Sequence, residues 1–201
     1  MSKALKTILI VVAILAVIGF LIFTPYNRLV GLDEGVKNAW AQVQNQLQRR
    51  MDLIPNLVKT VEGYANFERS TLEAVINARA KATSTQINAG DMNPAQLQQY
   101  MEAQNGLTSA LGRLMVVVER YPELKANENF IRLQDELAGT ENRIAVERKR
   151  YNDEVRVYNQ SVRKFPTVLI ANLLGFPQKP YFEAPVEAKT APTVDFSGLK
   201  K

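Results

Sequence analysis

The chain opens with an unbroken apolar run. Residues 8–23 read ILIVVAILAVIGFLIF, and with their small or apolar neighbours they make about twenty residues. That length is roughly what a helix needs to cross the 30 Å hydrocarbon core of a bilayer. The run is apolar on every side, so a helix buried in a soluble core is the least favoured interpretation. Lys6 precedes the run, and Pro25 and Tyr26 mark its other end. The pattern predicts a transmembrane anchor in residues 1–25.

A cleaved signal peptide is the competing interpretation. Its apolar region would be shorter and would end in small residues before the cleavage site. Here the run ends in the bulky residues Leu21, Ile22 and Phe23, directly before Thr24 and Pro25. This ending favours an anchor that stays attached to the mature protein.

Basic residues flank the apolar run unevenly. Lys3, Lys6 and the terminal amine precede it, and Arg28 and Lys37 follow it. The positive-inside rule therefore slightly favours a cytoplasmic N-terminus with the following domain on the outer, periplasmic side. The bias is small, so the reverse orientation stays open.

From Asp33 onward the apolar residues recur at steps of three and four, which is the pattern of amphipathic helices. The first apolar stripe consists of Val36, Trp40, Val43, Leu47, Met51, Ile54, Val58 and Val61. The stripe keeps its phase across Pro55, which therefore predicts a kink and not a chain reversal. Similar stripes fill residues 66–88, 94–120 and 125–162, with a loop ending in Asn93 as a cap and Pro94 as the first helical residue.

These stripes predict an all-α domain in residues 26–164. If the chain reverses near Gly63, residues 27–64 and 125–162 form two helices of about 57 Å each. Two shorter helices then fit between them, which gives an up-down-up-down four-helix bundle. The alternative is one kinked helix over residues 27–88, because the stripe barely changes phase at Gly63.

A short apolar segment, residues 165–177, follows the last long stripe. Its apolar members are Val168, Leu169, Ile170, Leu173, Leu174 and Phe176. One interpretation is a cap over the end of the bundle. The other is an interfacial helix that contacts the membrane or a partner. Residues 178–201 are polar with Pro180, Pro185 and Pro192, and we expect them to be a disordered tail.

The composition excludes several kinds of catalytic and metal-binding site. The chain has no Cys and no His, which excludes Ser-His-Asp and Cys-His catalysis and the usual ligands of zinc, haem and iron–sulfur clusters. Carboxylate catalysis and oxygen-ligated metals stay formally open, but no local signature supports them. The net charge of +5 is diffuse and gives no argument for nucleic acid. We therefore expect no enzyme, no cofactor and no metal site.

Four charged residues fall on or near the apolar stripes: Arg50, Arg79, Glu141 and Arg148. Buried charges are costly unless paired, so we expect internal carboxylate–arginine pairs that fix the helix register. The pairs Tyr151-Asn152 and Tyr158-Asn159 repeat at a spacing of seven. They indicate aromatic rings with neighbouring hydrogen-bonding amides, and we expect these residues to contribute to packing.

With these residues laid out, the sequence resembles the LemA family over residues 1–183. The matching stretches are Tyr26-Asn27-Arg28-Leu29-Val30, Arg50-Met51-Asp52-Leu53-Ile54-Pro55-Asn56-Leu57-Val58, Gly63-Tyr64-Ala65, Tyr121-Pro122-Glu123-Leu124-Lys125-Ala126-Asn127, Thr140-Glu141-Asn142-Arg143-Ile144, Arg148-Lys149-Arg150-Tyr151-Asn152, Tyr158-Asn159 and Phe165-Pro166. One departure is Phe67 before Glu68, where the family is expected often to carry His.

The resemblance implies a bacterial single-pass protein of the cytoplasmic (inner) membrane, with a bundle of long helices and no assigned enzymatic activity. A magnetosome-membrane relative suggests a role in membrane organisation. Other relatives are associated with membrane zinc metalloproteases of the HtpX type.

The expected function is that of a membrane-anchored scaffold. It would self-associate as a homo-oligomer, hold a membrane partner, or do both, and so organise or shape the bilayer. The alternative is an adaptor or regulator of an HtpX-type protease, and a carboxylate-only enzyme is least favoured. The expected partners are lipid, further copies of the chain and a membrane protease, with no nucleic acid.

Overall fold

The structure is a computed structural model and describes residues 3–64, 68–85, 87–90 and 92–183. Within this part of the chain all regular structure is helical. The helices are α1 (Lys3–Glu62), α2 (Arg69–Ser84), α3 (Pro94–Val118), α4 (Pro122–Lys125), α5 (Glu128–Arg163) and α6 (Thr167–Leu174).

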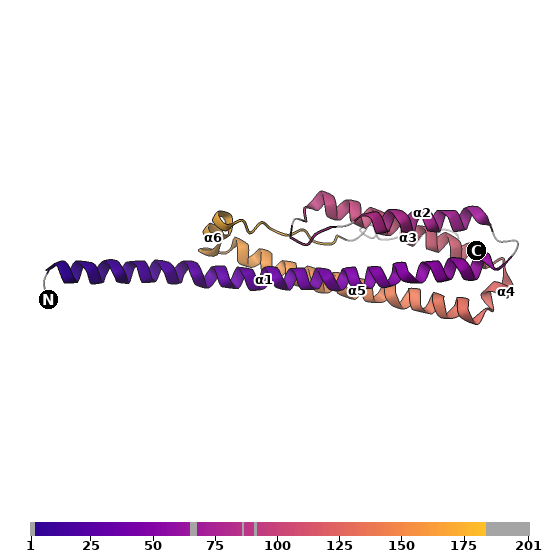
Figure 1. The fold of residues 1–201 in the computed structure, drawn as a ribbon, viewed down its shortest axis with the longest axis horizontal. Coiled ribbons are helices and arrows are strands. Elements are labelled where there is room, and N and C mark those ends of the chain that lie inside the picture. Colours follow the sequence, from indigo (N-terminus) through magenta and orange to yellow (C-terminus); the bar gives the residue numbers. More distant parts are fainter. Residues whose placement is uncertain (1–2, 65–67, 86, 91, 184–201) are drawn as a thin grey trace, which may run out of the picture.

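The longest element, α1, joins the apolar run to the bundle in one helix of 60 residues, about 90 Å long. We expected the bundle to begin with a separate helix at residue 27, but α1 continues through both Pro25 and Pro55. An interior proline removes one backbone hydrogen bond and crowds the preceding turn, but the remaining hydrogen bonds of a 60-residue helix continue on both sides of it. The N-terminal part of α1 projects alone beyond the other helices (Figure 1). It holds the one segment of the described chain that is long and apolar enough to span a membrane.

The chain reverses directly after α1. Gly63 lies in a turn in which the Tyr64 N–H donates to the Val61 carbonyl at 3.1 Å. The α2 helix then runs back along α1, and the Arg79 Nε donates to the Met51 carbonyl at 3.0 Å. The up-down-up-down bundle is therefore confirmed, and a single helix over residues 27–88 is excluded.

Local signals place the ends of the next helices. Asn93 caps α3 in a capping box with Gln96, as expected from its position before Pro94. The Asn127 side chain accepts from two backbone N–H groups and starts α5. The apolar periodicity did not predict α4, the single turn that carries the chain from α3 to α5. Its Leu124 is completely buried and ties this turn to the core.

The core has two parts along the long axis. The near core, closer to the apolar run, includes Trp40, Tyr100, Tyr151 and Tyr158. The far core, closer to Gly63, includes Ile54, Leu57, Leu114 and Phe130. Arg50 lies between Leu47 of the near core and Met51 of the far core on the same helix. The bundle is therefore divided by a polar layer around Arg50.

Candidate functional site

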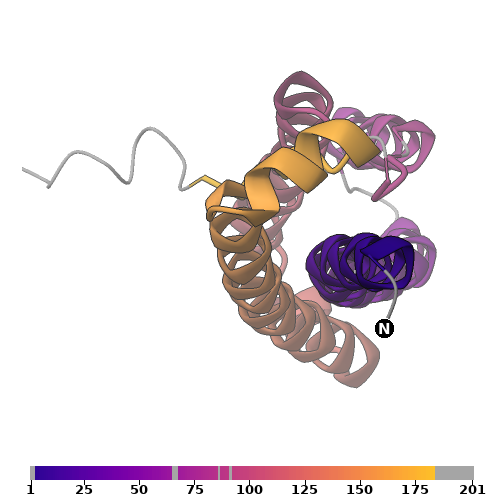
Figure 2. The same ribbon diagram turned by 90° about the vertical axis from the view of Figure 1, so that its left-hand side faces the viewer.

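The helix α6 crosses the near end of the bundle. It is seen almost end-on in Figure 1 and lengthwise in Figure 2, so it lies across the long axis. The helix ends at Gly175, whose φ of +75° is readily adopted only by glycine, and the Phe176 N–H donates to the Ala171 carbonyl at 2.9 Å. The ring of Phe176 meets Tyr26 of α1 edge-on, with centroids 6.0 Å apart. This contact fixes α6 beside the end of the apolar run.

The apolar residues of the 165–177 segment divide between two faces. Ala171 is completely buried, and Val168, Ile170 and Phe176 are half-buried against the bundle. On the other face Leu169 is 62% exposed, Leu173 82% and Leu174 45%, and Phe165 just before the helix is 82% exposed. One face of α6 thus caps the bundle as the first interpretation expected, while the other is uncovered within the described chain.

The chain after α6 is bound along the bundle, which corrects the expectation of disorder from residue 178 onward. We call residues 177–183 the strap; residues 184–201 of the expected tail lie outside the described residues. The Asn159 side chain donates to the Lys179 carbonyl at 2.8 Å and accepts from the Lys179 N–H at 2.9 Å. Asn152 binds the Phe182 backbone in the same two-way manner, both distances being 2.9 Å.

The spacing of these two asparagines matches the strap. Seven helical residues separate Asn152 from Asn159, a rise of about 10.5 Å. Three residues of extended chain separate Lys179 from Phe182, a span of about 10 Å. The two amides therefore hold an extended, antiparallel segment in one fixed register.

The tyrosines that precede these asparagines also bind the strap. The Tyr158 hydroxyl donates to the Pro177 carbonyl at 3.0 Å, and the Tyr151 hydroxyl donates to the Pro180 carbonyl at 3.1 Å. Burial raises the pKa of Tyr158 to about 12, and it raises the pKa of Tyr151 as well, so both hydroxyls keep their protons. Each Tyr-Asn pair is therefore one half of a clamp. The repeat at seven was visible in the sequence, but nothing in it identified the ligand.

An aromatic cluster and an ion pair complete the attachment. Phe182 stacks on Trp40, with ring centroids 5.7 Å apart, and meets Tyr151 edge-on at 5.1 Å. Lys179 is only 6% exposed, and its Nζ lies 3.2 Å from Asp33 Oδ1 of α1 and donates to the Gly90 carbonyl at 3.1 Å. The strap thus joins α1, α5 and the loop between α2 and α3.

Two lysines lower the pKa of the Asp33 carboxylate. Partial burial alone would raise the pKa of Asp33, but hydrogen bonds from Lys37 and Lys179 outweigh it. The pKa therefore lies below its ordinary value, and Asp33 is ionised at neutral pH.

The polar layer centres on Arg50, which is 2% exposed. Its Nη1 donates to Glu141 Oε2 at 2.7 Å and to Thr108 Oγ1 at 3.2 Å, and its Nη2 donates to Gln104 Oε1 at 2.5 Å. The expected pair of Arg50 with Glu141 therefore exists and links α1 to α5. The expectation that Glu141 is buried is wrong, because its side chain is 50% exposed and reaches inward from the edge of the bundle.

The other two arginines have no carboxylate partner of their own in the described chain. Arg79 donates to the Met51 carbonyl, as described above. The guanidinium of Arg148 lies 5.3 Å from the centroid of the Phe182 ring. Burial lowers the pKa of Arg148, and the nearby charge of Glu141 partly offsets this effect. Gln104 and Thr108 were missed in the sequence because uncharged polar residues on a helix give no sign of a buried partner.

One surface pocket of the described chain, at the start of α5, is lined by Glu128, Ile131 and Arg132 and so has a single carboxylate. Another surface pocket, of about 290 Å³, lies between α1, the end of α2 and α3. Its lining includes Gln44, Met51, Thr83 and Tyr100, and it contains no carboxylate. Glu141 does not reach this pocket.

The structure defines a class of protein: a long-helix bundle whose first helix carries a membrane-spanning candidate. The model of the LemA family matches residues 39–196, and the chain belongs to this family.

Known proteins support this assignment. The chain is 29% identical over 198 residues to magnetosome protein MamQ 1 of Paramagnetospirillum magneticum, covering 87% of this chain and 71% of the relative. It is 25% identical over 158 residues to protein LemA of Metamycoplasma hominis, covering 79% of this chain and 68% of the relative. The expected membership of the LemA family is confirmed.

Proposed function

We propose that the protein is a single-pass membrane scaffold whose bundle is held against the bilayer by α6. In this function it presents the bundle in a fixed pose to further copies of itself or to a membrane partner, and no step of catalysis is involved. The observation that carries the proposal is the uncovered face of α6, with Phe165, Leu169 and Leu173 exposed beside the end of the apolar run.

The energetics favour lipid on this face. Fully burying a leucine or phenylalanine side chain contributes about 1.5–3 kcal/mol. A helix with several such residues on one face and basic residues beside it is typical of segments that lie in the membrane interface. Arg163 and Lys164 are exposed directly before α6, and Arg28 is exposed on α1 just after the apolar run. Each basic residue near an anionic surface adds roughly 1 kcal/mol of attraction.

Because the clamp holds the chain after α6 against the bundle, a contact between α6 and lipid would also position the bundle. The strap follows α6 directly and is bound to α5 through Asn152 and Asn159. Ala171 and Phe176 secure α6 itself to the bundle. The C-terminal half of α6 is therefore fixed to the bundle, and a contact with lipid would set the position of the whole bundle and not of a loose tail.

A fluorescent label in full-length protein tests the proposal. The chain has no cysteine, so Leu173→Cys gives a single attachment site for an environment-sensitive fluorophore. In liposomes containing doxyl-labelled lipid we expect strong quenching at position 173. The matched control is Val116→Cys, because Val116 is also apolar and is 71% exposed on α3 in the far half of the bundle. Equal quenching at both positions, or none at 173, would overturn the proposal.

A further inference from the structure

We propose that α1 carries a surface for parallel, in-register association with a second copy of the same chain. The surface, which we call the amide face, consists of five exposed residues: Asn38, Ala41, Gln42, Asn45 and Gln48. This inference rests on the self-association in the proposed function and assigns it to one face of one helix.

The amide face is free of charge. Residues 38–48 read NAWAQVQNQLQ and contain no acidic or basic side chain, although 22% of the chain is charged. Lys37 and Arg49 bound this stretch, which is about 16 Å long. The apolar residues within it, such as Trp40, Val43 and Leu47, are buried in the near core. What remains outside is a stripe of amides with one small residue.

No helix of the described chain covers this face. Viewed along the bundle in Figure 2, α5, α6 and the α2–α3 pair lie around one side of α1, and the opposite side is open. The exposure of Asn38, Gln42 and Asn45 agrees with this view.

The membrane segment dictates how two copies would meet. Because α1 is one continuous helix from the apolar run to Glu62, two anchored copies stand parallel and at the same height. Each residue of the face then meets its own counterpart. An amide carries both donors and an acceptor and can pair with an identical amide, whereas a charged group would meet the same charge. A charge-free stripe of amides therefore fits this arrangement.

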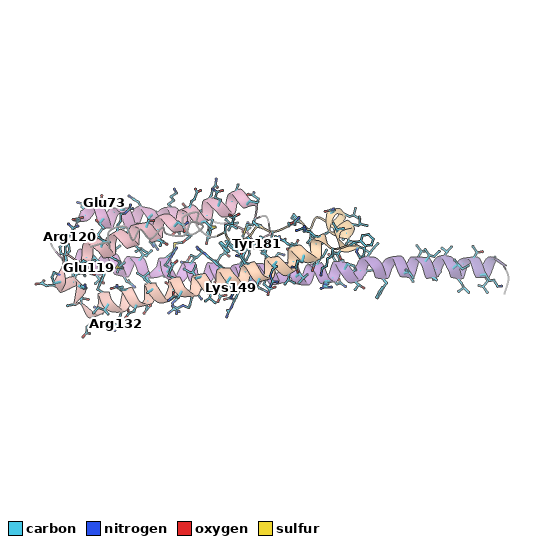
Figure 3. The ribbon with its side chains drawn as sticks, turned by 180° about the vertical axis from the view of Figure 1, so that it is seen from behind. Glu73, Glu119, Arg120, Arg132, Lys149 and Tyr181 are labelled. Atoms are coloured by element: carbon cyan, nitrogen blue, oxygen red, sulfur yellow. The ribbon has the colours of Figure 1, made fainter. Side chains whose placement is uncertain are left out.

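The other long helix, α5, does not fit parallel association with a second copy. The surface of α5 is densely charged: Arg150 pairs with Glu147 at 2.8 Å and Arg156 with Asp153 at 3.3 Å. Figure 3 shows Lys149, also exposed, about midway along the bundle. In the same parallel register these residues would place like charges together. Just below the amide face, Arg49 and Asp52 are exposed three residues apart on α1. There the Asp52 carboxylate accepts a hydrogen bond from Gln48 Nε2 of the same helix at 2.8 Å, so the charged residues begin where the amide face ends.

Cysteine cross-linking of the full-length protein in liposomes tests the assignment. The variants are Asn38→Cys, Gln42→Cys and Asn45→Cys, with Lys149→Cys as the control on α5. We expect each of the three amide-face variants to form disulfide-linked dimers about tenfold faster than the control under mild oxidation. Asn45→Lys, which opposes two like charges across the interface, should weaken dimerisation by about tenfold. Lys149→Gln should leave dimerisation unchanged.

The outcomes separate this inference from the proposed function. Dimers that cross-link through Lys149→Cys and not through the amide face would overturn the assignment but leave self-association standing. A chain that is monomeric by mass measurement in both detergent and liposomes would overturn self-association and the assignment together. Neither result alters the test of α6 by lipid quenching.

Discussion

Arg50 of α1 and Glu141 of α5 form an ion pair at 2.7 Å in which the cation is buried and the carboxylate is half exposed. The pair is therefore asymmetric. Water can reach Glu141, whereas Arg50 depends on Glu141, Gln104 and Thr108 for its hydrogen bonds.

This asymmetry predicts unequal costs of substitution. Arg50→Leu leaves the buried Gln104 without its donor, and we expect it to lower the free energy of unfolding by about 2–4 kcal/mol. Glu141→Gln keeps an acceptor for Arg50 and changes a partly exposed charge, so we expect a loss of about 1 kcal/mol or less. Thermal unfolding of the full chain in detergent, followed by circular dichroism, measures both. The reverse order would show that the carboxylate charge is the dominant interaction in the layer.

The clamp predicts a local effect at Asn159. Asn159→Ala leaves the Lys179 N–H without an acceptor in a buried position, at an expected cost of about 1–3 kcal/mol. Hydrogen exchange in residues 178–183 should accelerate while α5 stays protected. Asn142→Ala, an exposed asparagine on the same helix, should change stability by no more than about 0.5 kcal/mol. Unchanged exchange in the strap of the Asn159 variant would mean that the amide bonds do not hold it.

Attachment of the strap should weaken in acid. The pKa of Asp33 is lower when it is paired with Lys179 and Lys37 than in the unfolded chain. The stabilisation is therefore fully present above the ordinary pKa of about 3.9 and is lost as the pH falls through the lower folded value. Trp40 is the only tryptophan and stacks on Phe182, so its fluorescence should report the release. In Asp33→Asn the strap should already be loosened at neutral pH. An acid transition identical to that of the natural chain would place its origin elsewhere.

The charges that flank the apolar run predict the orientation of the bundle. Lys3 and Lys6 precede the apolar run, so we expect the bundle on the outer side of the cytoplasmic membrane. A reporter fused at Lys201 should be active only in an assay for exported protein. Activity only in the cytoplasmic assay would reverse the orientation and leave the contact of α6 with lipid unaffected.

The periodicity of apolar residues was enough to predict the helical bundle and most of its core. Val36, Trp40, Leu47 and Ile54 are buried as their spacing requires, and Asn93 caps α3. The periodicity did not predict the strap, because the strap is bound through its backbone groups to two asparagines of α5. An attachment of this kind leaves no periodic pattern in residues 177–183. Glu141 was misplaced for a related reason: helical phase gives the direction of a residue but not how far its side chain lies from the edge of the bundle.

The central claim is that α6 lies on the bilayer, and a spin label at Leu173 in full-length protein tests it most directly. In nanodiscs, collisions of the label with oxygen, which concentrates in lipid, can be compared with collisions with a water-soluble nickel complex. The account predicts that oxygen collisions dominate at position 173 and that nickel collisions dominate at Val116, which is exposed in the far half of the bundle. Dominant nickel collisions at position 173 would show that α6 faces water and would contradict the account.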